Sequence, residues 1–319
     1  MWSFCFIKNS NKLIFYVGFL LFVKSIIIIE GDDYMWVLCA FGSAFFAGIT
    51  SILAKCGIKK TDSHVATALR TIVVLFFSWL MVLVGGSHQS LSSISMRTWF
   101  FLIVSGLSTG ASWLCYFKAL QIGDINKVVP IDKSSTILTI ILAFIFLKEE
   151  ITPLKGRCVC MITIGTYLMI DKKEGEVKDE KGSWLIYALL SAIFASLTSL
   201  LGKVGMENID SNLGTAIRTA VVLVMAWVVV FACHKQHTLK DLDKHELLFI
   251  CLSGLATGAS WLCYYKALQM GPASVVVPID KLSLVVTVIF SYFVFHEKLN
   301  KKSLCGFICL IAGTLLMLL

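Results

Sequence analysis

The sequence has few charged residues for its length, and this scarcity excludes most soluble folds. Aspartate, glutamate, lysine and arginine make up 15% of the 319 residues, whereas soluble domains contain about 25%. Hydrophobic residues make up 57%, and the mean hydropathy is +0.84. A chain of this composition cannot hide its apolar surface in a water-soluble core, so we identify it as an integral membrane protein.

The sequence also lacks the motifs of several large function classes. It contains no nucleophile triad, phosphate-binding loop or dinucleotide fingerprint, so we expect neither an enzyme nor a cofactor. The net charge of +8 includes no long basic run interleaved with aromatic residues, so nucleic acid is not an expected partner. Most of the 11 cysteines lie in apolar runs, and Cys158 and Cys160 have the wrong spacing for zinc, so we expect no metal site.

Long apolar segments are abundant. Ten of them follow one another from Trp36, each with about 18–24 residues, which is enough to cross a hydrocarbon layer of about 30 Å as a helix. They do not alternate like barrel strands, so the predicted fold is all-α. The predicted helices cover residues 35–56, 64–85, 98–120, 125–147, 153–170, 184–204, 212–233, 245–268, 273–296 and 302–319.

The second half of the chain repeats the first. The stretch Gly106–Gly123 recurs as Gly254–Gly271 with 15 of 18 positions identical, and Val128–Lys133 recurs unchanged as Val276–Lys281. Both echoes are 148 positions apart. The same offset joins Lys55 with Lys203, Asp62 with Asp210, Arg70 with Arg218, Trp79 with Trp227 and Gly165 with Gly313. The chain is therefore a duplicated five-helix unit.

An odd number of helices in each unit determines the architecture. The second unit must enter the membrane from the opposite side, so the halves form an inverted repeat of the kind that recurs in secondary transporters. We predict an N-terminal extension (1–34), a first repeat (35–170), a polar linker (171–183) and a second repeat (184–319). The extension leaves three alternatives open: a weak extra helix, an uncleaved signal anchor, or an upstream segment preceding a start at Met35.

Charged residues inside the predicted helices are the first candidates for function. Arg70 lies about six residues into its helix, roughly 9 Å deep, and Asp132 lies at a similar depth. A charge at this depth is costly unless it is paired or hydrated. We therefore predict the ion pairs Arg70–Asp132 and Arg218–Asp280, which act either as a gate or substrate contact or as purely structural pairs.

Repeated lysines and aromatic residues are candidates for a substrate site. Lys133 and Lys281 lie about 100° around the helix from the neighbouring aspartates, so an anionic substrate is their expected partner. Trp113 and Trp261 lie at mid-span, away from the interface where tryptophan is usually found. Together with Tyr116 and Tyr264 they either line a cavity or fill the core.

Two further pairs of residues mark the fourth helix of each repeat. Pro130 and Pro278 each remove a backbone hydrogen bond, so they are either hinges or markers of a helix start. Glu149 and Glu297 follow the fourth helices, and we expect them to be solvated.

These features resemble the drug/metabolite transporter superfamily, specifically its EamA-like members. The resemblance covers residues 35–319 and is carried by Gly110–Leu120, by Pro130–Lys133 and by their repeats. The local sequence also resembles that of single-unit bacterial proteins of about 140 residues, here with two units fused in tandem. The resemblance implies a ten-helix basket with a central cavity that exports or exchanges small metabolites. In related sugar-phosphate translocators, late basic residues hold the phosphate, which would suit Lys281.

The resemblance also has departures. Proton-coupled multidrug pumps of the superfamily use a glutamate in the first helix, and residues 36–55 and 184–203 contain none. We therefore expect an anionic or zwitterionic metabolite rather than a cationic drug. The predicted protein is a multi-pass secondary transporter of the plasma (inner) membrane, monomeric or homodimeric, with a small-molecule substrate and lipid as partners. A non-transporting membrane scaffold or regulatory subunit is the alternative.

The loop charges predict an orientation that a reporter can test. Thirteen lysines lie in loops on the linker side of the membrane and four basic residues on the other side, once the symmetric lysines are set aside. The positive-inside rule then places the linker in the cytoplasm and the C-terminus outside, although relatives of known topology keep both termini inside. A topology reporter fused after Leu319 should give the external signal, and a cytoplasmic signal would contradict this orientation.

Overall fold

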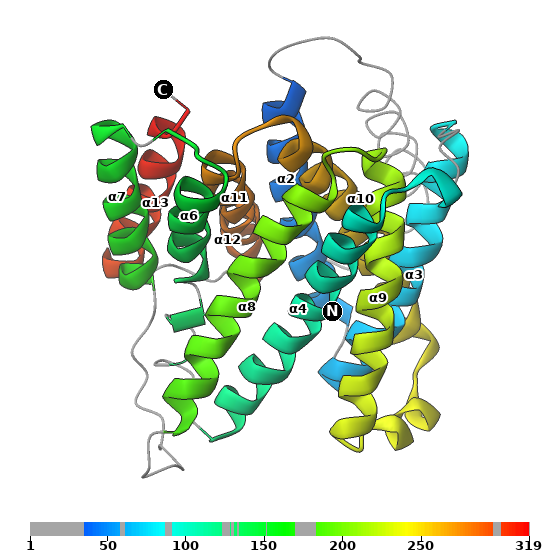
Figure 1. Cartoon of the computed structure of the whole chain (residues 1–319). Coiled ribbons are helices and arrows are strands. Elements are labelled where there is room, and N and C mark those ends of the chain that lie inside the picture. The colour runs from blue at the N-terminus through cyan, green and yellow to red at the C-terminus, as the bar shows by residue number, and fades with distance from the viewer. Residues whose placement is uncertain are drawn as a thin grey trace.

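The computed structural model describes residues 35–57, 61–86, 91–122, 128, 131–132, 134–150, 152–169, 183–295 and 301–318. Within these ranges the regular elements are helices (Figure 1). The first repeat contains α2 (Met35–Gly57), α3 (Ser63–Val84), η2 (Leu91–Ser93), α4 (Met96–Ile122), α6 (Ser135–Phe146) and α7 (Pro153–Met169). The second contains α8 (Ser183–Gly205), α9 (Ser211–Ala232), η3 (Gln236–Asp241), α10 (Lys244–Met270), α11 (Ala273–Lys281), α12 (Ser283–Phe295) and α13 (Lys301–Leu316). The N-terminal extension and most of the linker lie outside the described residues.

The helices confirm the membrane-protein prediction. Seven described segments are at least 18 residues long and apolar enough to cross a membrane, one of them formed by α11 and α12 together. The shorter α6, α7 and α13 have 12, 17 and 16 residues. These elements and the two repeats agree with a membrane protein of about ten helices.

Repeated residues form repeated local structure. Asp62 accepts a hydrogen bond from the backbone of His64 at the start of α3, and Asp210 does the same for Asn212 at the start of α9. Each aspartate satisfies a backbone N–H that has no partner within its helix. After these helices the chain turns through a left-handed residue, Gly86 (φ 62°) in one repeat and His234 (φ 54°) in the other. The position of the turn is therefore kept even where the residue is not glycine.

The fourth helix of each repeat is broken, which corrects the predicted continuous helices 125–147 and 273–296. In the second repeat α11 ends at Lys281 and α12 begins at Ser283. The Leu282 N–H donates to Ile279 O (2.9 Å), a three-residue step that interrupts the α-helical pattern. Ser134 occupies the same place in the first repeat, and its N–H donates to Ile131 O (3.1 Å). Pro278 lies inside α11, so the break falls one turn after it.

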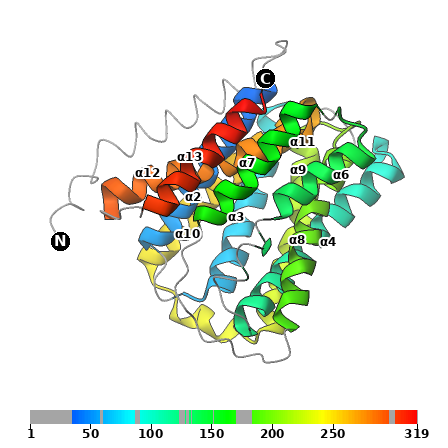
Figure 2. The ribbon, with the colours of Figure 1, turned by 90° about the vertical axis from the view of Figure 1, so that its left-hand side faces the viewer.

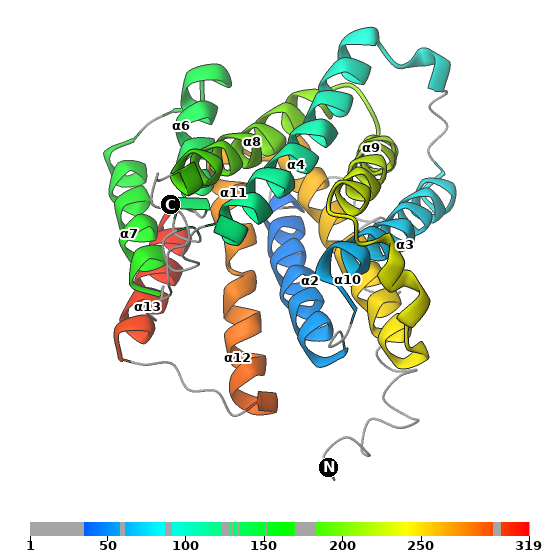
Figure 3. The same ribbon diagram turned by 90° about the horizontal axis from the view of Figure 1, so that it is seen from below.

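Helices of one repeat pack mainly against helices of the other. Helix α4 lies along α8, and its counterpart α10 lies along α2 (Figure 3). The contacts of α4 with α9 and of α6 with α8 are likewise matched by those of α10 with α3 and of α12 with α2. The second helices α3 and α9 pair at one end of the molecule, and the fifth helices α7 and α13 pair at the other. Exchanging the repeats therefore reproduces the packing, as a pseudo-two-fold axis requires.

The α7–α13 contact depends on glycine at the point where the two backbones meet (Figure 2). A Cβ atom added at Gly165 would lie 2.6 Å from the backbone nitrogen of Leu310 and 2.7 Å from the carbonyl oxygen of Gly306. Both are backbone atoms that cannot move without separating the helices. Small residues that allow such close approach are typical of membrane helix interfaces.

We expect Gly165→Ala to destabilise the protein by about 1–3 kcal/mol, because the new methyl group overpacks this interface. Gly156→Ala on the same helix is the matched control, since an added Cβ there meets no atom within 4 Å. The control should be neutral or stabilising by up to about 1 kcal/mol, since alanine favours the helix. Thermal unfolding of both variants in detergent measures the difference, and equal midpoints would contradict the packing argument.

Candidate functional site

A cavity of about 310 Å³ lies between the two repeats. Helices α2 and α4 of the first repeat and α8, α9, α10 and α11 of the second contribute its walls. Its charged lining residues are Arg218, Asp280 and Lys281, and its floor and walls include Trp113 and Trp261. Asp280 and Lys281 reach it from the C-terminal end of α11, directly before the break in the fourth helix. The broken helix thus places two charged residues at the interface between the repeats.

The structure brings together most of the second-repeat candidates and few of the first-repeat ones. Lining the cavity are Trp113, Arg218, Trp261, Tyr264, Asp280 and Lys281. Tyr116 instead packs in a cluster around Ala119 and Ala188. Lys133 and Pro130 lie outside the described residues, so their predicted roles remain predictions.

Hydroxyl groups bridge the repeats in two matching sets. Ser43 on α2 donates to Asp280 Oδ1 (2.7 Å) and lies 3.3 Å from the hydroxyl of Ser260. At the positions 148 residues away, Ser191 on α8 donates to Asp132 Oδ1 (2.7 Å) and lies 3.4 Å from the hydroxyl of Ser112. Each carboxylate is thus held by a serine of the opposite repeat.

The two predicted ion pairs are not formed among the described residues. Asp280 and Asp132 accept hydrogen bonds from serine hydroxyls, while Arg218 donates to Ser105 and Arg70 donates to Thr67. A hydroxyl donor satisfies a carboxylate without burying a second charge. The gating role of these residues remains a prediction.

Arg218 is the most deeply buried charged residue of the cavity, with 1% of its surface exposed. Its Nε donates to Ser105 Oγ (3.0 Å) and its Nη2 donates to Thr109 Oγ1, both on α4 of the first repeat. The guanidinium carbon lies 4.6 Å from the ring centre of Tyr265 and 5.5 Å from that of Trp261. Aromatic faces attract a cation and partly offset its loss of hydration. Nη1 is also buried, and it has no hydrogen-bond partner among the described residues.

Arg70, the counterpart of Arg218 in the repeat, has a different environment. It is only partly buried, and its Nη2 donates to Thr67 Oγ1 (3.3 Å) on its own helix. Thr257 and Thr50 contact each other (3.2 Å) as their counterparts Thr109 and Thr198 do (3.3 Å), so this threonine pair is kept while the arginine contacts differ. Two arginines at equivalent sequence positions are therefore used differently, one inserted between the repeats and one remaining on its own helix.

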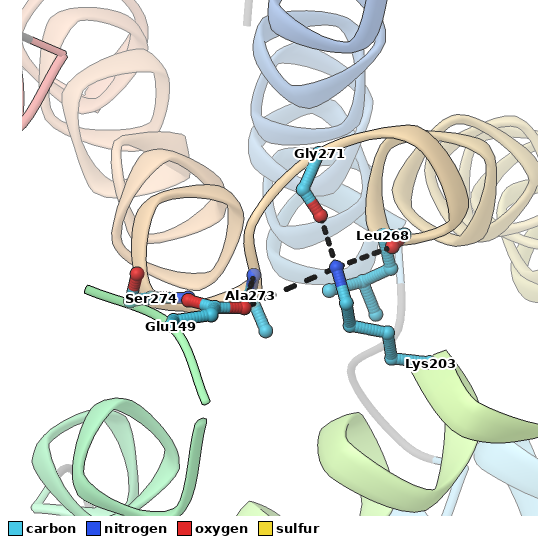
Figure 4. Close-up of polar contacts among 6 residues, drawn as sticks. All are labelled: Glu149, Lys203, Leu268, Gly271, Ala273 and Ser274. Carbon is cyan, nitrogen blue, oxygen red and sulfur yellow. Dashed lines mark hydrogen bonds and ion pairs between the residues drawn. The ribbon is translucent and has the colours of Figure 1, made fainter. Parts of the chain in front are cut away.

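Tyr265 and Glu149 have roles that the sequence interpretation missed. Tyr265 is 2% exposed and lies under the Arg218 guanidinium. The only indication of this role in the sequence was that Tyr265 of the second repeat stands where the first repeat has Phe117. Glu149 was expected to be solvated, and this expectation is wrong. Its side chain is 11% exposed and accepts hydrogen bonds from the backbone N–H groups of Ala273 and Ser274 (Figure 4).

Two interlocked helical repeats, a broken helix in each and a charged cavity between them are the features of a membrane transporter. The profile of the EamA-like transporter family matches residues 34–171 and again residues 182–319. The chain therefore belongs to the EamA-like transporter family, as its motifs predicted.

Similar proteins agree with this assignment. An uncharacterized transporter encoded in the cobO 3′ region of a Sinorhizobium species is 44% identical over 135 residues, which are 42% of this chain and 96% of that protein. That relative thus has the length of a single repeat. The S-adenosylmethionine uptake transporter of Rickettsia bellii is 27% identical over 280 residues, covering 84% of this chain and 90% of that protein. Human solute carrier family 35 member G1 is 24% identical over 285 residues, which cover 85% of this chain and 75% of that protein.

A solved crystal structure shares the fold. It superposes with a TM-score of 0.72 over 90% of this chain and 98% of its own, at 13% sequence identity. The chain therefore has a fold that is known from experiment.

The unequal environments of the two arginines predict unequal effects of the same substitution. Arg218→Lys keeps the charge but cannot hold Ser105, Thr109 and the Tyr265 ring together, because lysine lacks the planar fork of donors. We expect it to destabilise the protein by about 2–3 kcal/mol. Arg70→Lys is the matched control and should cost less than about 1 kcal/mol. Thermal unfolding in detergent compares them, and equal losses would contradict the asymmetry.

Proposed function

We propose that this protein is a secondary transporter that exports or exchanges a small anionic or zwitterionic metabolite by alternating access through the cavity between its repeats. We further propose that it acts in the plasma (inner) membrane, as a monomer or homodimer. Lys281 contacts the substrate, and the aromatic side chains of Trp113, Trp261 and Tyr264 surround it.

One observation carries the substrate class: the unpartnered Nη1 of Arg218 at a cavity that also contains Asp280 and Lys281. A buried donor without a partner costs free energy, and the cost is removed when a ligand accepts its hydrogen bond. An anionic oxygen is the strongest acceptor available to a guanidinium group. The substrate proposed here therefore presents an anionic group to Arg218.

The charges of the cavity support the same choice. Arg218 and Lys281 are positive and Asp280 is negative, so the three groups leave one positive charge unbalanced. A substrate with net negative charge balances it, and a zwitterion places its positive group at Asp280. A substrate with net positive charge adds to the imbalance, and charges interact strongly in a site removed from water.

The difference between the repeats supports alternating access. In an inverted repeat, exchanging the conformations of the two halves converts a site open to one side into a site open to the other. Arg218 and Arg70 differ in the way that such an exchange requires, because one is buried between the repeats and the other is partly exposed.

The names of the Rickettsia relatives suggest a second candidate substrate. They are called S-adenosylmethionine uptake transporters, with 23–27% identity to this chain. S-adenosylmethionine has a carboxylate for Arg218 and an adenine ring for the tryptophans. Its sulfonium and ammonium groups give it a net positive charge, however, so the cavity charges favour an anion or a neutral zwitterion over it.

Counterflow into proteoliposomes tests the proposal directly. Vesicles preloaded with one metabolite and supplied outside with the same labelled metabolite should accumulate label, and empty vesicles should not. A panel of organic anions, neutral zwitterions and S-adenosylmethionine, preselected by thermal shift, separates the candidate classes. Accumulation of S-adenosylmethionine alone would contradict the charge argument, and no binding or flux across the panel would favour the scaffold alternative.

We expect Lys281→Ala to abolish counterflow while the protein still inserts into the membrane, because the variant loses the cavity's second positive group. Lys301→Ala is the matched control, since Lys301 is exposed at the start of α13. Loss of flux of at least about tenfold in the first variant corresponds to about 1.4 kcal/mol of lost stabilisation. Wild-type flux in Lys281→Ala would remove Lys281 from the substrate site.

A further inference from the structure

A cluster of charged and backbone groups lies where α10 ends and α11 begins (Figure 4). Helix α10 ends at Met270, and only Gly271 and Pro272 separate it from Ala273, the first residue of α11. The last carbonyl groups of one helix and the first N–H groups of the next therefore lie close together. Such groups have no partner within their own helices and need one from elsewhere.

Glu149 supplies the partner for the start of α11. Its Oε1 accepts a hydrogen bond from the Ala273 N–H (2.7 Å), and its Oε2 accepts one from the Ser274 N–H (3.0 Å). Pro272 occupies the N-cap position of α11 and has no side-chain oxygen with which to cap it. A carboxylate from the first repeat thus caps a helix of the second. The negative charge also suits the positive end of the helix dipole.

Lys203 supplies the partner for the end of α10. Its Nζ donates to Leu268 O (3.1 Å) and to Gly271 O. The same Nζ lies 3.9 Å from Glu149 Oε1, so the two side chains also form an ion pair. The side chains are only 18% and 11% exposed, which reduces the screening that weakens surface ion pairs.

The position of these contacts connects them to the cavity. Helix α11 has nine residues, and Asp280 and Lys281 are its last two. Asp280 lies seven positions after Ala273, which is about 10 Å of helix. Residues Ala273 to Ile279 are all buried, so α11 is packed against its neighbours along most of its length. Displacement of its capped end would therefore displace the charged groups in the cavity.

We infer that Glu149 and Lys203 are positioning residues for transport: by clamping the α10–α11 junction they hold Asp280 and Lys281 in place in the substrate cavity. This role in transport rests on the function proposed above. Neither residue lines the cavity among the described residues, so they act through α11 rather than on the substrate.

Amide hydrogen exchange tests the clamp without any substrate. Glu149→Gln removes the charge and leaves one oxygen for two N–H groups. We expect exchange at residues 273–276 to become about tenfold faster, as the loss of hydrogen bonds to a charged group implies. Exchange at residues 277–285, which include the cavity residues, should rise with it. Glu150→Gln is the matched control, because Glu150 is exposed and directly adjacent.

Transport kinetics test the consequence. In Glu149→Gln the KM for the counterflow substrate should rise about three- to tenfold, while the amount of inserted protein stays the same as in Glu150→Gln. Lys203→Gln, which leaves both carboxylate hydrogen bonds available, should have the smaller effect in both assays. It also serves as the test variant should Glu149→Gln fail to insert.

The outcomes distinguish this inference from the proposed function. Unchanged exchange at residues 277–285 in both clamp variants would overturn the positioning role, whatever the transport result. Faster exchange with an unchanged KM would also overturn it. If the wild-type protein shows no flux, the proposed function fails, while exchange at residues 277–285 still decides whether the clamp holds the cavity segment.

Discussion

The packing of each repeat against the other, rather than within itself, is the constraint on which the rest of the structure depends. Helix α2 of the first repeat lies along α10 of the second, and α8 of the second lies along α4 of the first. Consequently both repeats line the cavity. The contacts around it also join the repeats, because Ser43 of the first repeat donates to Asp280 of the second and Ser191 of the second donates to Asp132 of the first. A shift of one repeat relative to the other would therefore change these contacts. A change in the relation of the repeats is thus also a change in the site.

Neutral hydroxyl and aromatic groups, rather than opposite charges, accompany the charges of this site. Arg218 is held by two hydroxyls and lies beside two aromatic rings, and Asp280 is held by a serine hydroxyl. A buried ion pair between Arg218 and Asp280 would satisfy each with the other and leave little for a ligand. Keeping them apart leaves the arginine with a buried, unpartnered donor. That arrangement costs free energy in the empty protein and increases the part of the binding energy that depends on the substrate's charge.

Helix boundaries were predictable from the sequence to within a few residues, because apolar length and local capping residues such as Asp62 and Asp210 act over short distances. The repeat also predicted which residues would be equivalent. The partners of charged residues were not predictable in the same way. Arg218 was paired with Asp280 because opposite charges at equal depth minimise the cost, but its hydroxyl partners on α4 are small residues more than 100 positions away. Glu149 was assigned to solvent because its partners are backbone N–H groups 124 and 125 positions away, which carry no sequence signal at all.

The repeat is symmetric in sequence but not in structure, and this difference is informative about mechanism. Because Arg70 and Arg218 occupy equivalent positions, a strictly symmetric molecule would place both between the repeats or neither. Arg218 donates hydrogen bonds to Ser105 and Thr109 of the other repeat, whereas Arg70 donates to Thr67 on its own helix. The sequence around the two arginines is nearly the same, since Ser105 and Thr109 recur as Ser253 and Thr257, but Tyr265, which lies under Arg218, corresponds to Phe117. The alternating access proposed above requires a second arrangement, related to this one by the pseudo-two-fold axis, in which Arg70 is inserted and Arg218 is released. A small difference in free energy between two such arrangements is the condition for a ligand of modest affinity to shift the population between them.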